Sequence, residues 1–533
     1  MAEQKIALPR ASTPEEVGIS SAWVADFMNK IEERRVNLHS FMIVRNGQVA
    51  AECYRFPFTK DRPHAMYSVS KTFTATAVGI AAAEGLLSLD DKVVSFFPEL
   101  SLPADPRLEQ MTVRHLLNMT AGKDVNVLSD KSKGKWAECF FNSPWFNEPG
   151  KEFRYISENT YMLSAIVNRA AGMCMRDFLE PRLFKPLGID YPFWETDENG
   201  IEAGGWGLYC KTEDIAKLML CYLQKGTFNG RQVIPEEFAE AAPRMQTDNS
   251  ASSSASDSAA GYGYGIWRSA RKDTYRADGM FSQFSIVLED KNAVMAVTAG
   301  IPLEQEALDF LFEDLERMFL ENADEETLPV TGLYDRLAAA AIETPSPATS
   351  SPLQLTVEGR NIHFRKKIFL NLIGFPMSML PLAVTFMAND RAGNIDDVCF
   401  HFDEASLTIS WREGDEANTV RAGMNGRFCY GEMTLGGVDF HVSATAEWRA
   451  DDRLYIQIRP LETIGKRMLE FRFRTGDRVV MTPSSDPDTH EITRFLRQCL
   501  FDAFKNPVIQ RVGALALKAL PGIVEPKHYG HFC

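Results

Sequence analysis

The stretch HAMYSVSKTFTATAVGIAAAEGLLSLDD, residues 64–91, holds two serines on either side of a valine and a lysine directly after the second serine. On a helix, positions i and i+3 share one face, so Ser68 and Lys71 would lie side by side and Ser70 would point elsewhere. A serine hydroxyl needs a base, and a lysine can serve only if burial or a neighbouring charge lowers its pKa. The small apolar residues that follow Lys71 are typical of a buried helix. The stretch therefore predicts Ser68 as a candidate nucleophile at the start of a buried helix over 71–84, where backbone N–H groups could hold an oxyanion.

The same pattern also has a purely structural interpretation. A Ser-x-x-Lys sequence occurs by chance in many chains of this size, most often as the capped, solvated start of a helix. The pair becomes informative only if further groups elsewhere in the chain belong to the same site.

Composition limits the class of protein. The chain has 533 residues, of which 45% are hydrophobic and 24% charged, as in ordinary globular proteins with more than one domain. A formal net charge of −15 argues against a nucleic-acid partner. The N-terminal residues lack the apolar core of a signal peptide, and the nine cysteines form no C-x-x-C pair. We therefore expect reduced thiols, a cytoplasmic location, and no metal or cofactor; the oligomeric state stays open.

One span has nearly the length of a membrane helix, about 20 residues. Residues 368–388, IFLNLIGFPMSMLPLAVTFMA, contain Asn371, Pro376 and Pro381. These residues favour irregular buried structure, so we do not expect a membrane association.

The chain consists of two regions with different sequence patterns. Residues 1–325 mix strands with amphipathic helices: a hairpin at 39–56 begins the region, a strand pair at 276–300 ends it, and helices lie between. Strands at both ends of such a region predict an antiparallel α+β domain whose terminal strands share one sheet. A linker rich in Pro, Ser, Thr and Ala follows within 326–352. Residues 353–533 alternate in short segments, which predicts a mostly β accessory domain with a C-terminal helix near 489–505.

The opening stretch resembles the active-site helix of the serine hydrolases related to class C β-lactamases and penicillin-binding proteins. That family includes esterases, D-aminopeptidases, nylon-oligomer hydrolases and acyltransferases. Four further stretches match in family order, at 111–122, 149–172, 204–234 and 275–297. The resemblance covers about residues 10–320. It implies a β-lactamase-like fold, which is an antiparallel sheet flanked by helices. Some relatives carry a small lipocalin-like barrel, and the accessory domain could be a barrel of this kind.

The resemblance also assigns roles to single residues. Ser68 would be the acylated nucleophile, Lys71 its partner in proton transfer, and Tyr155 the phenol that passes a proton to the leaving group. Whether Lys71 or Tyr155 is the base stays open, because their titrations would be coupled. The usual Tyr-x-Asn motif is Tyr155-Ile156-Ser157 here, as in the nylon-oligomer hydrolase and esterase branch, so Ser157 would keep a hydrogen-bonding side chain at the site.

The third family motif departs further from the lactam and peptide enzymes. Lys-Thr-Gly or His-x-Gly is replaced by Ala277-Asp278-Gly279, which removes the cation that would bind a substrate carboxylate. Arg276 could replace that cation only if its side chain turned inward, against the alternation of a strand. Gly279 would let the substrate approach the strand, and the N–H of Met280 would join that of Ser68 as an oxyanion donor.

These residues together predict a serine hydrolase that acts through an acyl-enzyme on an ester or amide of a small molecule, with an ester as the first choice. Two alternatives stay open. One is an acyltransferase, in which an alcohol or amine takes the place of water. The other is a non-catalytic sensor of small molecules on the same fold.

Overall fold

The structure is a computed structural model. It describes residues 6–124, 135–322, 329–365, 395–413, 416–435, 437–494, 497, 508, 511–515, 517–518 and 525–533. The chain forms two compact units, one of Met1–Arg55 with Thr59–Ala340 and one of Phe56–Phe58 with Ala341–Cys533. The 368–388 span and most of the helix expected near 489–505 lie outside the described residues.

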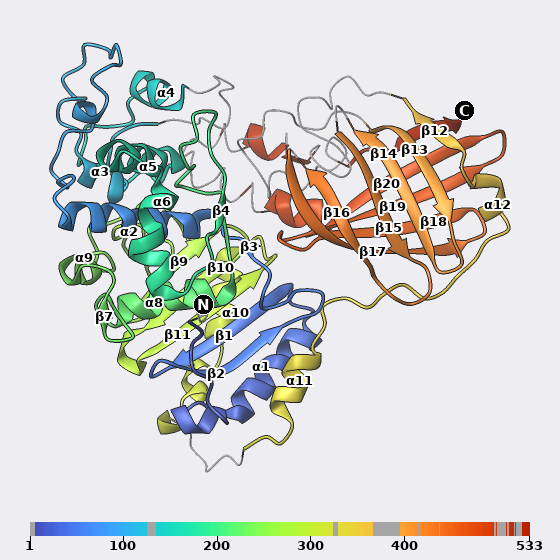
Figure 1. Ribbon diagram of the computed structural model, residues 1–533, viewed down its shortest axis with the longest axis horizontal. Coiled ribbons are helices and arrows are strands. Elements are labelled where there is room, and N and C mark those ends of the chain that lie inside the picture. The colour runs from blue at the N-terminus through green and yellow to red at the C-terminus, as the bar shows by residue number, and fades with distance from the viewer. Residues whose placement is uncertain are drawn as a thin grey trace. The chain divides into compact units, whose positions relative to one another are not determined.

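The first unit is built on a six-stranded antiparallel sheet (Figure 1). Its strands, in spatial order, are β2 (Gln48–Tyr54), β1 (Leu38–Arg45), β11 (Ala293–Ala299), β10 (Gln283–Leu288), β9 (Thr274–Gly279) and β8 (Trp267–Arg268). Strands from the two ends of the region lie side by side at the centre, where Phe41 pairs with Val297. The expected α+β domain with terminal strands in one sheet is therefore confirmed.

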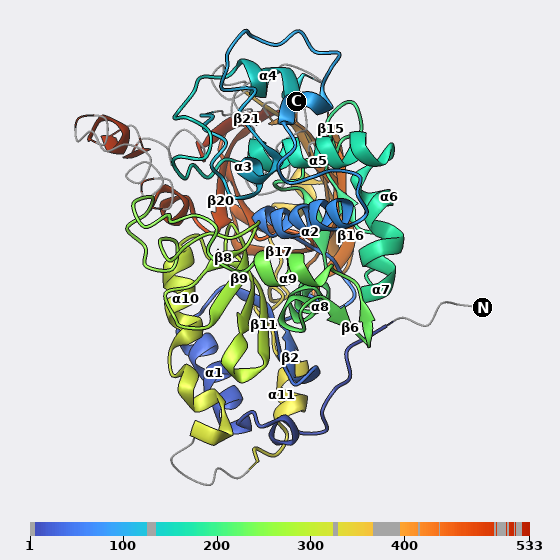
Figure 2. The same cartoon turned by 90° about the vertical axis from the view of Figure 1, so that its left-hand side faces the viewer.

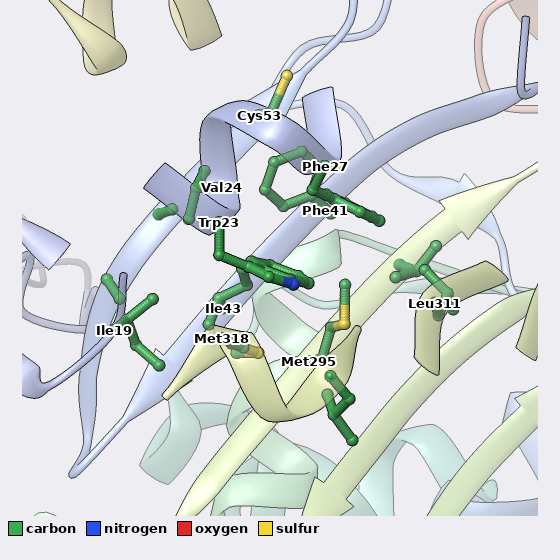
Figure 3. Packing of buried hydrophobic residues seen from close by; sticks show 14 of the residues in the cluster. Ile19, Trp23, Val24, Phe27, Phe41, Ile43, Cys53, Met295, Leu311 and Met318 are labelled. Carbon is green, nitrogen blue, oxygen red and sulfur yellow. The ribbon is translucent and has the colours of Figure 1, made fainter. Parts of the chain in front are cut away.

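Strand alternation gives the sheet two different faces. Phe41, Ile43 and Met295 point to one face, where they pack against α1 (Ser21–Glu33) and α10 (Glu304–Phe312) in the core shown in Figure 3. The opposite face carries Ser40 and Ser285, whose hydroxyls bond to α8 (Thr212–Leu223), the helix that contacts β1, β10 and β11 (Figure 2). Helices thus cover both faces of the sheet.

The helix α2 (Ser70–Ala83) is buried along nearly its whole length. Most of its residues are alanine, threonine or other small uncharged residues, and they are buried on every side of the helix, which is typical of the interior of a domain. It packs against α5 (Ser157–Ala171), and a Cβ at Gly79 would lie 2.4 Å from the Phe238 ring. The buried helix expected over 71–84 is confirmed, and it begins next to Ser68.

The second unit is a β-barrel, as expected for residues 353–533. In its described residues, ten strands follow one another as neighbours, and β15 closes the ring by pairing with β17 at Gly423 and Thr445. The strands are β12 (Asn361–Phe364), β13 (Ile395–Phe402), β14 (Ser406–Glu413), β15 (Glu416–Gly423), β16 (Cys429–Leu435), β17 (Val438–Ala450), β18 (Arg453–Pro460), β19 (Lys466–Arg474), β20 (Arg478–Asp486) and β21 (His528–Phe532).

The segment before the barrel is attached to it. Glu343, which lies within the expected linker, is buried and forms an ion pair with the buried Arg459 on β18. None of the helices in the described part of the chain combines the length and the apolar character that crossing a membrane requires.

Candidate active site

The two serines of the opening stretch have different surroundings. Ser68 lies in a single 3-10 turn, η2 (Tyr67–Val69), and is partly exposed. Ser70 is fully buried; its hydroxyl donates to the Tyr67 carbonyl at 2.5 Å and accepts from the Leu208 N–H at 3.3 Å. Tyr67 has a φ of 45°, a left-handed conformation that a tyrosine rarely adopts. Ser70 therefore holds a strained turn that presents Ser68.

Lys71 lies against the Ser68 hydroxyl. Its Nζ is 2.9 Å from Ser68 Oγ, 3.0 Å from Ser157 Oγ and 2.7 Å from the Gly205 carbonyl oxygen. The side chain is almost completely buried, and this burial lowers the pKa of Lys71 to about 7 although the carboxylates of Glu158 and Asp278 raise it. A neutral amine has two N–H groups, which can donate to the Gly205 carbonyl and the Ser157 hydroxyl. Its lone pair can then take the proton of Ser68. The arrangement suits a lysine that acts as a base.

Tyr155 lies on the other side of the same hydroxyl. It precedes α5, its ring centroid is 4.8 Å from Lys71 Nζ, and its ring packs against that of Trp267 with centroids 5.1 Å apart. Its hydroxyl is close enough to the Ser68 hydroxyl for the latter to influence the pKa of Tyr155. Burial raises the pKa of Tyr155 far above its ordinary value. The phenol therefore stays protonated at neutral pH and can donate a proton, which leaves Lys71 as the better base.

The structure thus brings Ser68, Lys71, Tyr155 and Ser157 together. Sequence reasoning missed the Gly205 carbonyl and the Trp267 indole. A Cβ at Gly205 would lie 2.7 Å from the Ser157 carbonyl oxygen, so a glycine is needed for this approach. The Gly204-Gly205 pair was the only hint in the sequence that the backbone approaches the site here. A backbone carbonyl is present in every residue, so the sequence cannot show which one contacts Lys71.

A family model for beta-lactamases matches residues 23–309, more than half of the chain and the whole of the region that carries these groups. The chain belongs to the beta-lactamase family.

Individual relatives are distant. The chain is 28% identical over 236 residues to the 6-aminohexanoate-dimer hydrolase of Paenarthrobacter ureafaciens, a match over 40% of this chain and 59% of that enzyme. It is 26% identical over 153 residues to a beta-lactamase of Escherichia coli, over 28% of this chain and 40% of the relative. It therefore matches less than two thirds of the length of either relative.

The fold of a solved structure agrees with the family. A Bacillus anthracis protein provisionally named a 6-aminohexanoate-dimer hydrolase superposes with a TM-score of 0.50 at 17% identity, over 61% of this chain and 90% of that protein. At this identity the likeness concerns the fold alone.

Within this beta-lactamase fold, Gly279 lies at the end of β9, against the turn that carries Ser68. A Cβ at this position would lie 2.3 Å from the Met66 carbonyl oxygen and 3.2 Å from the Val69 nitrogen. The Cβ side of Gly279 is therefore occupied by the protein's own backbone, which requires a glycine at this position. That Gly279 also lets the substrate approach the strand stays a prediction. Met280 follows directly and is partly exposed; its role as an oxyanion donor stays a prediction.

Arg276 does not replace the cation of the lactam-binding relatives. It is buried, its Nε donates to Asp278 at 2.7 Å, and its Nη1 donates to the carbonyls of Asp257 and Arg268 and to the Ser269 hydroxyl. Because the side chain is buried and both Nε and Nη1 are bound to acceptors of the protein, the guanidinium is poorly placed to bind a substrate carboxylate. The third motif of this beta-lactamase family member therefore holds a buried ion pair between Arg276 and Asp278.

Proposed function

We propose that this protein is a serine hydrolase that forms an acyl-enzyme on Ser68 from a small-molecule ester or amide. The observation that carries the proposal is the 2.9 Å contact between Lys71 Nζ and Ser68 Oγ, in surroundings where burial lowers the lysine pKa to about 7. A hydroxyl paired with a partly neutral amine is an activated nucleophile.

Acylation begins when Ser68 Oγ attacks the substrate carbonyl carbon and its proton passes to Lys71. The N–H groups of Ser68 and Met280 hold the oxyanion of the tetrahedral intermediate. When the intermediate collapses, the bond to the leaving group breaks, Tyr155 protonates that group, and the Lys71 ammonium returns a proton to Tyr155. Water then attacks the acyl-enzyme by the same proton route, which releases the acid and restores the Ser68 hydroxyl.

An ester is the preferred substrate and a β-lactam is disfavoured. β-Lactams carry a carboxylate, and Asp278 beside the site would repel it while Arg276 is already bound to Asp278. A panel of small esters and amides, assayed with wild type and with Ser68→Ala, tests the proposal. Turnover that depends on Ser68 supports it, whereas no turnover, or equal turnover by both proteins, contradicts it.

The pH dependence should follow Lys71. Because the amine must be neutral to accept the Ser68 proton, kcat/KM for a neutral ester should rise with pH through about 7 and then level off. No fall from Tyr155 is expected at moderately alkaline pH, since burial raises its pKa far above the ordinary value. Steady-state kinetics with an uncharged ester measure the profile, and a flat profile across neutral pH would speak against Lys71 as the base.

Tyr155→Phe should lower turnover by about 10²-fold, the usual contribution of a positioned acid. The loss should be larger for an alkyl ester, whose alkoxide needs a proton to depart, than for a nitrophenyl ester, whose phenolate leaves without one. The two substrates are compared in wild type and variant. An equal loss for both would show that Tyr155 acts by packing and not as a proton donor.

A further inference from the structure

The barrel unit has an open pocket beside the short helix α12 (Gln354–Val357), which lies at one end of the barrel (Figure 1). The pocket has a volume of about 630 Å³, within the range of roughly 300–1,000 Å³ that small-molecule sites occupy. Part of its lining is apolar and comes from Leu353, Val357, Phe473 and Phe532. The two phenylalanine rings are nearly parallel, with centroids 6.0 Å apart. The pocket therefore offers an apolar, partly aromatic surface to a ligand.

The charged side chains of the lining have a surplus of positive charge. They are four arginines and two aspartates, namely Arg360, Arg472, Arg474, Arg478, Asp452 and Asp477. Asp477 accepts a hydrogen bond from Arg360 Nη2 at 3.1 Å. Asp452 accepts one from Arg472 Nε at 3.0 Å. Both carboxylates are thus taken by two of the arginines, although the chain as a whole has a net charge of −15.

The other two arginines face each other across the hairpin of β19 and β20. Arg474 and Arg478 are both exposed and are direct cross-strand partners, an arrangement in which like charges destabilise a sheet. Among the described residues the Arg474 side chain has no hydrogen-bond or ion-pair partner. Arg478 Nε donates to the Thr475 carbonyl over a long 3.4 Å. One anion between the two guanidiniums would satisfy both and remove their repulsion.

Arg360 adds a positive group whose position is fixed. Its guanidinium carbon lies 4.1 Å from the centroid of the Phe532 ring, while its Nη2 is bound to Asp477. A guanidinium that stacks on an aromatic ring and donates to a carboxylate is held in one orientation, unlike a solvated surface arginine. The pocket thus joins an oriented cation and two arginines without a carboxylate partner to an apolar lining.

We propose that this pocket binds a small phosphate monoester, with the phosphate between Arg474 and Arg478 and the organic group against the two phenylalanine rings. A phosphate monoester has a charge of about −1.5 to −2 at neutral pH and accepts paired hydrogen bonds from guanidiniums, so it matches the surplus charge. The apolar lining favours a ligand with an apolar body over inorganic phosphate. The site goes beyond the proposed hydrolase, because it uses residues of the barrel unit and none of the catalytic set.

Calorimetric titration of the full chain with phenyl phosphate tests the site. Three comparison ligands each lack one feature: phenol has no phosphate, benzoate has a single negative charge, and inorganic phosphate has no ring. The Kd of phenyl phosphate should be lower than that of each comparison ligand by about tenfold or more. Equal binding of inorganic phosphate and phenyl phosphate would show an adventitious ion only and would overturn the inference.

Arg474→Gln and Arg478→Gln should each raise the Kd of phenyl phosphate by about tenfold, because each removes a charged donor to the phosphate. Arg427→Gln is the matched control, since Arg427 is an exposed arginine of the same unit that does not line the pocket. It should leave the Kd unchanged. The two pocket variants should keep the wild-type Tm without ligand, because both positions are exposed and the substitutions remove a like-charge contact.

The absence of phenyl phosphate binding would overturn the inference. So would a Kd that neither pocket variant alters, or one that Arg427→Gln alters equally. The outcome is independent of the hydrolase proposal, because the readout is binding and not turnover. A Ser68→Ala protein should bind phenyl phosphate with the wild-type Kd, and a loss of binding in that variant would place the ligand at the proposed active site and contradict the barrel site.

Discussion

Ser68→Ala is expected to lower ester turnover by about 10³-fold or more, as removal of a nucleophile does in other serine hydrolases. Ser70→Ala loosens the turn that presents Ser68 but keeps the nucleophile, so it should lose far less turnover. Ser68 is the partly exposed serine in contact with Lys71 Nζ, so no other described hydroxyl of η2 or α2 can replace it. The free energy of unfolding should hardly change, because the Ser68 side chain fills no part of the core.

Ser70→Ala is the matched control, since it removes the same atom two residues away. Its hydroxyl joins the Tyr67 carbonyl to the Leu208 N–H, and the loss of both bonds should reduce the free energy of unfolding by about 1–3 kcal/mol. Denaturant unfolding and kcat/KM are measured for both variants. Wild-type turnover by Ser68→Ala, or a loss of turnover in a folded Ser70→Ala as large as that in Ser68→Ala, would contradict the assignment.

Lys71→Met is expected to lower kcat/KM by about 10³-fold, within the range that positioned acid–base groups contribute. Methionine fills much of the same space in an unbranched chain, so the buried helix can keep its packing. It cannot take the proton of Ser68, and it leaves the Gly205 carbonyl and the Ser157 hydroxyl without their donor. The unfolding free energy should fall by about 1–3 kcal/mol for those unpaired groups.

The measurement is kcat/KM across pH, together with denaturant unfolding at the same temperature. The variant should lose both the rate and the rise with pH through about 7 that wild type shows. Near-normal turnover in a folded Lys71→Met protein would refute the lysine as base, and a wild-type pH profile at a reduced rate would assign the titration to another group.

The local part of the site could be predicted from residue spacing. The i, i+3 pair and the small apolar residues after it predicted the contact between Ser68 and Lys71 and the burial of the helix. The structure adds that Ser68 lies in a 3-10 turn just before α2, next to a tyrosine with positive φ. That detail comes from the packing of the turn on Gly279, which local sequence does not record.

The distant part of the site needed the family resemblance. Tyr155 and Ser157 follow Ser68 by more than 80 positions in the chain, and no periodicity of the sequence links them to it. Alternation argued against an inward-turned Arg276, but it could not show that every residue of β9 is buried or that Arg276 pairs with Asp278, because both depend on the packing of the sheet. The same limit applies to Glu343, whose burial with Arg459 on the barrel could not be inferred from a segment rich in Pro, Ser and Ala.

The central claim is that the Ser68 hydroxyl is activated by the amine beside it, and covalent labelling tests it most directly. Wild type is treated with a fluorophosphonate at neutral pH, digested, and the modified peptide is located by mass spectrometry. One adduct is expected, on Ser68, and it should form far more slowly in Lys71→Met. An adduct on Ser70 or elsewhere, or an equal rate of labelling in the two proteins, would contradict the account.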